Sequence, residues 1–176
     1  PTLIRSVNPA KDWQAYRALV DYFKRQAFDV VHTHSSKAGV LARFAARKAG
    51  IPVIIHTVHG QPFHRCERGW RNRLFIAAER RAARTSTRIL AVAQAMVDQC
   101  VQAGIAPREK YKVVYSGMEM QSFLHATRDV TLRQRLGIPP TAPVVGKIAR
   151  LFEHKGHDYL IAAAAAIVTE APHVRF

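Results

Sequence analysis

Short β-branched runs alternate along this chain with segments of helical periodicity, and that alternation allows few folds. Each of five apolar runs has the composition of a strand; they cover residues 28–34, 52–58, 87–93, 111–116 and 143–149. The segments between them repeat their apolar side chains about every 3.6 residues, as an amphipathic helix does. Nearly continuous apolar strands joined by helices indicate a parallel sheet with helices on both faces. The sequence therefore predicts a doubly wound α/β fold.

Helix-ending residues support this reading of the segments between the strands. In the helix expected over 37–49, Ser36 is placed to cap the first turn, and Gly50 with Pro52 to end the last. The alanine-rich segment 159–168 is far shorter than the roughly 20 apolar residues that span a bilayer. It is therefore predicted to be a buried helix.

The regular alternation fails between residues 118 and 142, where an irregular stretch precedes the proline-rich "GIPPTAP". We predict a first domain over 1–125. A linker over 126–142 follows, with a short helix near 131–136, and a second domain begins over 143–176. Because that second domain would hold only one strand, one helix and a strand stub, we expect the chain to be a segment of a longer protein and to be inactive alone.

Charge and composition restrict the partners and the setting. The formal net charge of +15 predicts attraction to a polyanion, which could be nucleic acid, an anionic membrane surface or a phosphorylated ligand. With 48% hydrophobic and 22% charged residues, the chain is globular rather than disordered. Its two cysteines, Cys66 and Cys100, cannot build a disulfide framework, so a reduced, cytoplasmic setting is expected.

Ligands of open parallel sheets bind beyond the carboxyl ends of the strands, and three such ends carry reactive side chains here. The first is "HTHSSKAG", where His34, Ser35 and Lys37 stand at a strand end and a helix start. The free backbone N–H groups of a helix start favour an anion or a carbonyl oxygen. A capped helix with a solvated lysine would have the same sequence, so both interpretations stay open.

The second strand end is "HTVHGQP". Strand alternation places Thr57 and His59 on one face, opposite to His56. His59 stands at the carboxyl end, and Gly60 behind it allows a sharp turn or the close approach of a ligand. A structural histidine that donates to a carbonyl would also fit this position, and that alternative stays open.

The third strand end is "GKIARLFEHKG". Gly146 lies within the predicted strand, where a missing side chain permits close backbone approach. Arg150 and Lys155 follow across a short loop, and Gly156 leads into the next helix. A guanidinium fork, an ammonium group and a helix N-terminus that converge on one volume suit a diphosphate.

A resemblance to a known family adds to this reading. The chain resembles a glycosyltransferase family 4 enzyme in four successive blocks: "VVHTHSSKAGVLARFAARKAGIPVIIHTVHG", "RILAVAQAMVDQCVQAGI", "VVYSGMEMQSF" and "VVGKIARLFEHKGHDYLIAAAAAIV". The blocks occur in the order of the family and cover residues 30–176. Such enzymes have the GT-B architecture, in which the active site lies between two doubly wound domains.

This resemblance implies that the first domain is an acceptor-side, Rossmann-like domain that lacks its first strands. It also implies that the second is the truncated start of a nucleotide-sugar-binding domain. It implies that His59 contacts the donor sugar beside the reacting carbon and that Arg150 and Lys155 hold the donor diphosphate. No cofactor and no metal are expected, and the sugar would pass with retention to a saccharide or lipid-linked acceptor. The family more often has Asn-Gly-Ile-Asp where this chain has "SGME", so Ser116 and Glu119 leave the detail of that turn open.

Arginines and apolar residues are interleaved over residues 63–84, a mixture that suits the surface of an anionic membrane. The residues expected at that surface are Arg71, Arg73, Arg80 and Arg81. A solvated helix face with its apolar side in the core would read alike. We expect a cytoplasmic protein that attaches peripherally to the inner face of the membrane and binds no nucleic acid.

Three other functions remain as alternatives. A nucleotide-sugar epimerase has the same architecture. A basic nucleic-acid-binding module would account for the charge, although the chain has no zinc-finger spacing and no RNA-recognition motif. A metal site at His59, His64 and Cys66 lacks the helical pair or the CxxC spacing of such sites.

Overall fold

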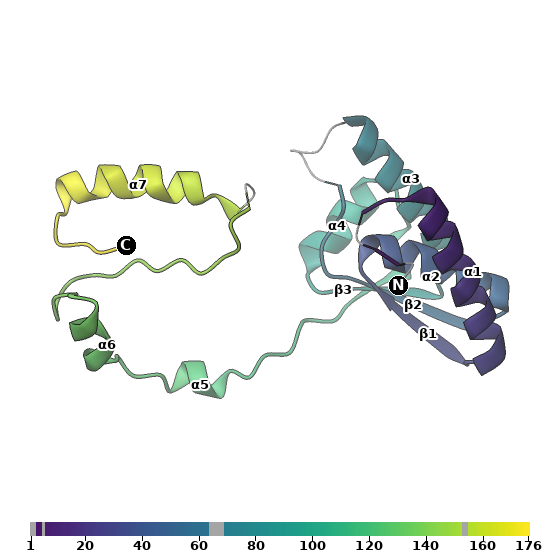
Figure 1. The fold of residues 1–176 in the computed structure, drawn as a ribbon, viewed down its shortest axis with the longest axis horizontal. Helices are drawn as coiled ribbons and strands as arrows, with labels where there is room; N and C mark the ends of the chain where they lie inside the picture. Colours follow the sequence, from purple (N-terminus) through teal and green to yellow (C-terminus); the bar gives the residue numbers. More distant parts are fainter. Residues whose placement is uncertain (1–2, 5, 64–68, 153–154) are drawn as a thin grey trace. The chain divides into compact units, whose positions relative to one another are not determined.

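The structure, a computed structural model, describes residues 3–4, 6–63, 69–152 and 155–176 (Figure 1). They divide into two compact units, Pro1–Met118 and Glu119–Phe176. The sequence-based division into 1–125, 126–142 and 143–176 stays a prediction.

The first unit is an alternation of helices and parallel strands (Figure 1). Its elements are α1 (Pro9–Gln26), β1 (Val30–His34), α2 (Ser36–Ala49), β2 (Val53–Val58), α3 (Gly69–Thr85), β3 (Arg88–Ala91), α4 (Gln94–Gln102), the 3₁₀ helix η1 (Arg108–Lys110) and β4 (Tyr111–Val113). The strands form one sheet in the order β1-β2-β3-β4, and every neighbouring pair is parallel. The predicted parallel α/β class is confirmed.

One face of the sheet is covered by helices. Connections between successive parallel strands are right-handed in nearly all proteins, so sequential strand order puts the crossover helices on one side. The buried side chains of Thr33, His56 and Ile89 lie on that side, and the His56 ring lies against Gly39 of α2. Val30 on the other side is half exposed.

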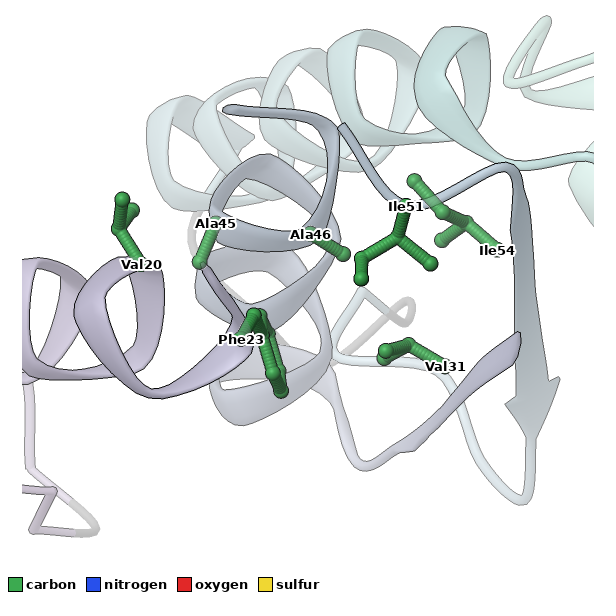
Figure 2. Close-up of a cluster of buried hydrophobic side chains, with 7 residues drawn as sticks. All are labelled: Val20, Phe23, Val31, Ala45, Ala46, Ile51 and Ile54. Atoms are coloured by element: carbon green, nitrogen blue, oxygen red, sulfur yellow. The ribbon is translucent and has the colours of Figure 1, made fainter. Parts of the chain in front are cut away.

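Small and large apolar side chains interlock where α1, α2 and the first two strands meet (Figure 2). Val20 and Phe23 of α1 pack onto Ala45 and Ala46 of α2, both of which are fully buried. Alanine at these positions lets the two helices approach closely. The sheet side of the cluster is made by Val31, Ile51 and Ile54. A second cluster joins α3, β3 and α4 through Ala83, Ile89, Cys100 and Ile105.

The ends of α2 agree with the sequence in part. Gly50 takes the left-handed conformation (φ 83°) and donates its N–H to the carbonyls of Ala46 and Arg47, so the predicted helix end is confirmed. The predicted cap at Ser36 is wrong, because Ser36 is the first helical residue. Ser35 is the N-cap, and its hydroxyl makes no capping bond. Its backbone instead has φ 64° and ψ 153°.

In its described residues the second unit has the helices α5 (Gln121–Leu124), α6 (Val130–Arg135) and α7 (His157–Glu170). Asp129 caps α6 by accepting from the N–H of Leu132 at 2.8 Å. The helix predicted near 131–136 and the helix predicted over 159–168 are both present. The predicted burial of the latter is wrong, because described residues do not cover α7 and Ile161 is 67% exposed.

The strand predicted over 143–149 is also wrong. Only an isolated parallel bridge forms there, between Val144 and Arg175. The N–H of Val145 donates to the Arg175 carbonyl at 2.8 Å, and Arg175 donates to the Pro143 carbonyl at 3.0 Å. A strand needs a partner ladder of several residues, and the facing segment around Arg175 offers one position. Among the described residues no helix is both long enough and apolar enough to cross a membrane.

Candidate active site

Three histidines gather at the carboxyl edge of the sheet. His32 and His34 belong to the end of β1, and His59 directly follows β2. Because β1 and β2 are parallel, with His34 opposite Thr57, their carboxyl ends meet at one edge. The ring centres of His32 and His34 are 4.3 Å apart, and those of His34 and His59 are 5.2 Å apart. The structure thus brings two of the sequence-predicted site residues, His34 and His59, into contact.

A hydrogen bond joins His34 and His59. Nδ1 of His34 lies 2.9 Å from Nε2 of His59, and both side chains are exposed. An N–H···N bond needs one protonated and one unprotonated nitrogen, so the accepting ring is neutral while the bond exists. Nδ1 of His59 is the ring nitrogen outside this bond, and it can donate to or accept from a ligand. Among the described residues, the hydrogen-bond partner of His59 is thus a side chain, His34.

His32 lies beside His34 and adds a third ring to this group of histidines. Its Nε2 lies 2.7 Å from Oγ1 of Thr57, on the strand face that also carries His34 and His59. Burial lowers the pKa of His32, and the neighbouring His34 and His59 lower it further. Adding a positive charge here costs free energy because the three rings are close. The sequence alternation did place Thr57 and His59 on one face, but it did not reveal their partners on β1.

Ser35 holds an unusual backbone conformation between β1 and α2. Its φ of 64° with ψ of 153° falls in a region that glycine occupies almost exclusively. Such a conformation in another residue costs on the order of 1–3 kcal/mol and concentrates at functional sites. Gly60, in contrast to Ser35, does not have a left-handed φ, and a Cβ built there would meet no atom within 4 Å. The space beside Gly60 is open.

The ammonium group of Lys37 makes two contacts within the fold. Its ammonium lies 2.5 Å from Oδ1 of Asp12 in α1 and donates to the Ser6 carbonyl at 2.6 Å. These contacts tie α2 to α1 and to the segment before it. The predicted role of Lys37 as a ligand-binding loop residue stays a prediction, and its charge is already opposed by Asp12.

A buried ion pair between α2 and α3 lies close to the site. Arg43 is fully buried, and its Nη2 donates to Oε2 of Glu79 in α3 at 2.6 Å. Its Nε donates to the Gly39 carbonyl at 3.0 Å. A cavity of about 40 Å³ lies beside this pair and is also lined by Ser35, His59 and other side chains. The sequence analysis did not predict this pair. The sequence signal for it is the position of Arg43 in α2, four residues after Gly39 and three before Ala46, both of which are small and buried.

His56 is buried on the helix-covered face of β2. Its Nδ1 lies 2.9 Å from Oγ1 of Thr33, and its ring contacts Gly39 so closely that a Cβ at that glycine would clash. Burial, together with the nearby Arg43 charge, lowers the pKa of His56 to about 3. The ring is thus neutral in the folded chain at neutral pH.

Acid should destabilise the chain through His56. The unfolded state takes up a proton near pH 6.5 and the folded state does not, so the contribution of His56 is complete above pH 6.5 and falls as pH drops toward 3. At about 1.4 kcal/mol per pH unit, the free energy of unfolding should fall by about 2 kcal/mol between pH 7 and pH 5. Urea unfolding at a series of pH values measures this.

The matched variants are His56→Gln, which cannot titrate, and His125→Gln at an exposed histidine. His56→Gln should flatten the dependence between pH 7 and pH 5, and His125→Gln should preserve it. Equal slopes in His56→Gln and the unmodified chain would contradict the assignment.

The basic loop of the second unit leads into α7. Gly156, with φ 62°, precedes the first helical residue His157, whose Nε2 lies 2.9 Å from the Arg150 carbonyl. The guanidinium of Arg150 lies 5.0 Å from the centre of the Phe152 ring. The His157 contact holds the backbone of Arg150 near the start of α7, and the described residues before Arg150 in this unit form no strand. The predicted role of Arg150 stays a prediction.

Lys147 is a residue of this loop that sequence reasoning missed. Its ammonium donates to the carbonyls of Lys155 and Gly156, the latter at 2.9 Å. It thereby fixes the backbone that carries the side chain of Lys155. At Gly146 a Cβ would meet no atom within 4 Å. The loop thus places Arg150 and Lys155 near an exposed helix start, where free N–H groups add positive potential.

The four arginines predicted to face a membrane do not share one side of α3. At about 3.6 residues per turn, Arg73 and Arg80 lie on one side and Arg71 on the opposite side. Arg80 donates to the carbonyls of Gly104 at 2.7 Å and Ala103 at 3.1 Å, which caps the end of α4. Arg81 lines a groove with α1 and α2.

No group of side chains in the described part of the chain supports the metal-site alternative. His64 and Cys66 lie outside the described residues. Across residues 3–4, 6–63, 69–152 and 155–176, no three His, Cys, Asp or Glu side chains are grouped to hold a metal ion.

Comparison with known proteins places these features in a family. The family model of the glycosyl transferase 4-like domain matches residues 2–117. A galactosyltransferase of Escherichia coli, "UDP-Gal:alpha-D-GlcNAc-diphosphoundecaprenol alpha-1,3-galactosyltransferase", is 32% identical over 169 residues, which are 96% of this chain and 44% of that protein. The D-inositol 3-phosphate glycosyltransferase of Thermobispora bispora is 26% identical over 84% of this chain and 35% of its own length.

Solved structures agree. The Anabaena protein HepE in complex with UDP has a TM-score of 0.68 at 26% identity, over 87% of this chain and 40% of its own. HepE in complex with UDP and glucose has a TM-score of 0.67 at 28% identity, over 89% of this chain and 41% of its own. The chain thus spans less than half the length of these relatives. Since the family model matches well over half of the chain, the chain belongs to the glycosyl transferase 4-like domain family.

Proposed function

We propose that the whole protein is a glycosyltransferase that moves a sugar from a nucleotide-sugar donor to a lipid-linked or saccharide acceptor. The observation that carries this is the family match over residues 2–117. The complexes of HepE with UDP support a uridine nucleotide on the donor, and the Escherichia coli relative supports a lipid-linked acceptor. The epimerase and nucleic-acid alternatives find no support in these comparisons.

The proposed chemistry assigns one task to the residues of each unit. Breaking the glycosidic bond leaves positive charge on the sugar carbon and adds negative charge to the departing diphosphate. Arg150, Lys155 and the start of α7 stabilise that negative charge without a metal or a cofactor. His59 lies against the donor sugar, and its bond to His34 fixes the orientation of the ring. The sugar is transferred with retention of its configuration.

Acceptor dependence tests this proposal. The whole protein is incubated with UDP-sugars, and UDP release and sugar interconversion are followed with and without a lipid diphosphate sugar. UDP release that requires the acceptor is expected. Interconversion of the sugar without an acceptor would instead establish an epimerase. Tight binding to duplex DNA that falls steeply with salt and is unaffected by UDP-sugars would establish the nucleic-acid module.

We further propose that the protein works in the cytoplasm, attached peripherally to the anionic inner face of the membrane. The net charge of +15 supports this, as do the exposed side chains of Trp70 and Arg73, which lie on one side of α3 near its start. Arg80 is a weaker candidate because the end of α4 already holds its guanidinium.

Vesicle binding should respond to Arg73. The protein should sediment with anionic vesicles at low salt and leave them at high salt. Replacing Arg73 with glutamine should weaken binding by about 1 kcal/mol, or roughly 5-fold, at about 1 kcal/mol per cation. Arg135→Gln, at an exposed position of the second unit, is the matched control. Equal binding to neutral vesicles would contradict the electrostatic attachment.

A further inference from the structure

The loop that follows β2 carries His59 between two fixed points. Before His59, the carbonyl of Val58 accepts from the N–H of Val92 at 3.4 Å, which joins the end of β2 to the residue after β3. After it, Gln61 is half-buried and its side chain reaches α4. Gly60 lies between, and a Cβ built there would meet no atom within 4 Å. The open space at Gly60 gives the loop little support, so its course depends on the two fixed points.

The side-chain amide of Gln61 makes two hydrogen bonds to α4. Its Nε2 donates to the carbonyl of Met96 at 3.1 Å and to Sγ of Cys100 at 3.3 Å. An amide nitrogen carries two hydrogens, so both bonds can form at once. Cys100 is 3% exposed, and burial raises the pKa of its thiol, so the sulfur is uncharged at neutral pH and accepts only weakly. The Met96 carbonyl is thus the stronger partner.

Packing beneath this loop is incomplete. The cavity of about 40 Å³ is lined by His59, Gly60 and Gln61 of the loop, and by Cys100 of α4 and Tyr111 of β4. Close packing fixes side chains elsewhere in a protein interior, but a cavity offers no atoms to pack against. The hydrogen bonds of Gln61 therefore restrict the loop at a place where packing does not.

The ring of His59 depends on this restriction. Its Nε2 lies 2.9 Å from Nδ1 of His34, and this bond is exposed. A bond of this kind competes with water and contributes only about 1 kcal/mol, so it cannot hold the loop by itself. Gln61 is anchored two residues after His59, whereas Phe63, which packs against the second cluster, is four residues away. Gln61 is thus the nearest anchor on that side of His59.

We propose that Gln61 is a positioning residue for sugar transfer: its bonds to α4 hold the loop so that the His59 ring meets both His34 and the donor sugar. This inference rests on the proposed function, in which His59 lies against the sugar. Gln61 itself touches no reacting atom. A looser loop leaves the donor bound and makes the productive orientation of His59 rarer, so Gln61 acts on turnover rather than on donor binding.

Gln61→Met tests this in the whole protein, because methionine keeps the length of the side chain and removes both donated hydrogens. We expect kcat to fall about 10-fold, since small displacements of a positioned group have effects of this order, and KM for the UDP-sugar to change less than about twofold. Imidazole ¹⁵N NMR spectra, recorded without any sugar, report the positioning independently of activity. The ring signals of His34 and His59 should shift as their bond is weakened, and those of the buried His56 should stay in place.

Gln94→Met is the matched control, because Gln94 bonds Asp98 within α4, at 3.1 Å on an exposed surface. It should leave kcat and the histidine signals unchanged. Unmoved His34 and His59 signals in Gln61→Met would overturn the proposal, as would an unchanged kcat or an equal loss in Gln94→Met. Shifted signals in Gln61→Met of a protein that consumes no UDP-sugar would support the positioning and refute only the proposed function.

Discussion

His59→Ala should lower the turnover of the whole protein by roughly 10²-fold or more while the fold survives. A positioned group beside a reacting centre contributes effects of this size. The side chain of His59 is exposed and packs into no described hydrophobic cluster, so its loss should barely alter unfolding. Steady-state kinetics with the preferred UDP-sugar, together with thermal unfolding, measure both quantities.

His34 and His125 provide the comparison. His34→Gln keeps a group that can bond Nε2 of His59, so it should cost much less than His34→Phe, which removes the bond. His125→Ala, at an exposed histidine of the second unit, should leave turnover unchanged. A His59→Ala protein that unfolds but keeps its activity per folded molecule would show that His59 is structural.

Arg150→Ala should reduce turnover by about 10²-fold to 10³-fold, and it should weaken UDP binding by much less. The charge on the diphosphate grows as the glycosidic bond breaks, so a fixed guanidinium stabilises the transition state more than the bound donor. Lys155→Ala should behave alike. The double variant should be less than additive because both groups act on one diphosphate. Kinetics and UDP titration on the same preparations separate the two effects.

A conservative variant separates the effect of the charge of Arg150 from the effect of the shape of its side chain. Arg150→Lys should rescue only partly, since an ammonium group does not reproduce the bidentate fork. Arg135→Ala removes an exposed arginine from α6 and should leave both kinetics and UDP binding unchanged. Unchanged kinetics in both Arg150→Ala and Lys155→Ala would place the donor diphosphate elsewhere.

Local pattern was enough to predict the first unit. Continuous β-branched runs and glycine-ended helices require only neighbouring residues, and Gly50 ends α2 where the sequence indicated. The position of His59 at the end of β2 follows from the same local reasoning. The parallel order of the strands then brings both "HTHSS" and "HTVHG" to one edge.

Contacts between distant residues were beyond local pattern. The His34–His59 bond depends on the register between β1 and β2, which a single strand does not specify. The Arg43–Glu79 pair joins residues 36 positions apart. Ser35 adopts a glycine-like backbone that no propensity favours. These tertiary features are the ones that shape the site.

In the second unit, two predictions made from local sequence were wrong. Residues 143–149 have the composition of a strand, but a strand needs a partner, and here the backbone pairs only around Arg175. The apolar side chains of α7 predicted burial, whereas Ile161 is largely exposed because described residues do not cover it. Propensity is local, while pairing and burial depend on what lies alongside.

A crystal structure of the whole protein with a bound UDP-sugar tests the central claim most directly. The account predicts that oxygens of the donor diphosphate lie within about 3.2 Å of the Arg150 guanidinium and the Lys155 ammonium. It also predicts that the His59 ring, held by His34, lies against the sugar. A diphosphate held by other cations, with His59 remote from the sugar, would contradict it.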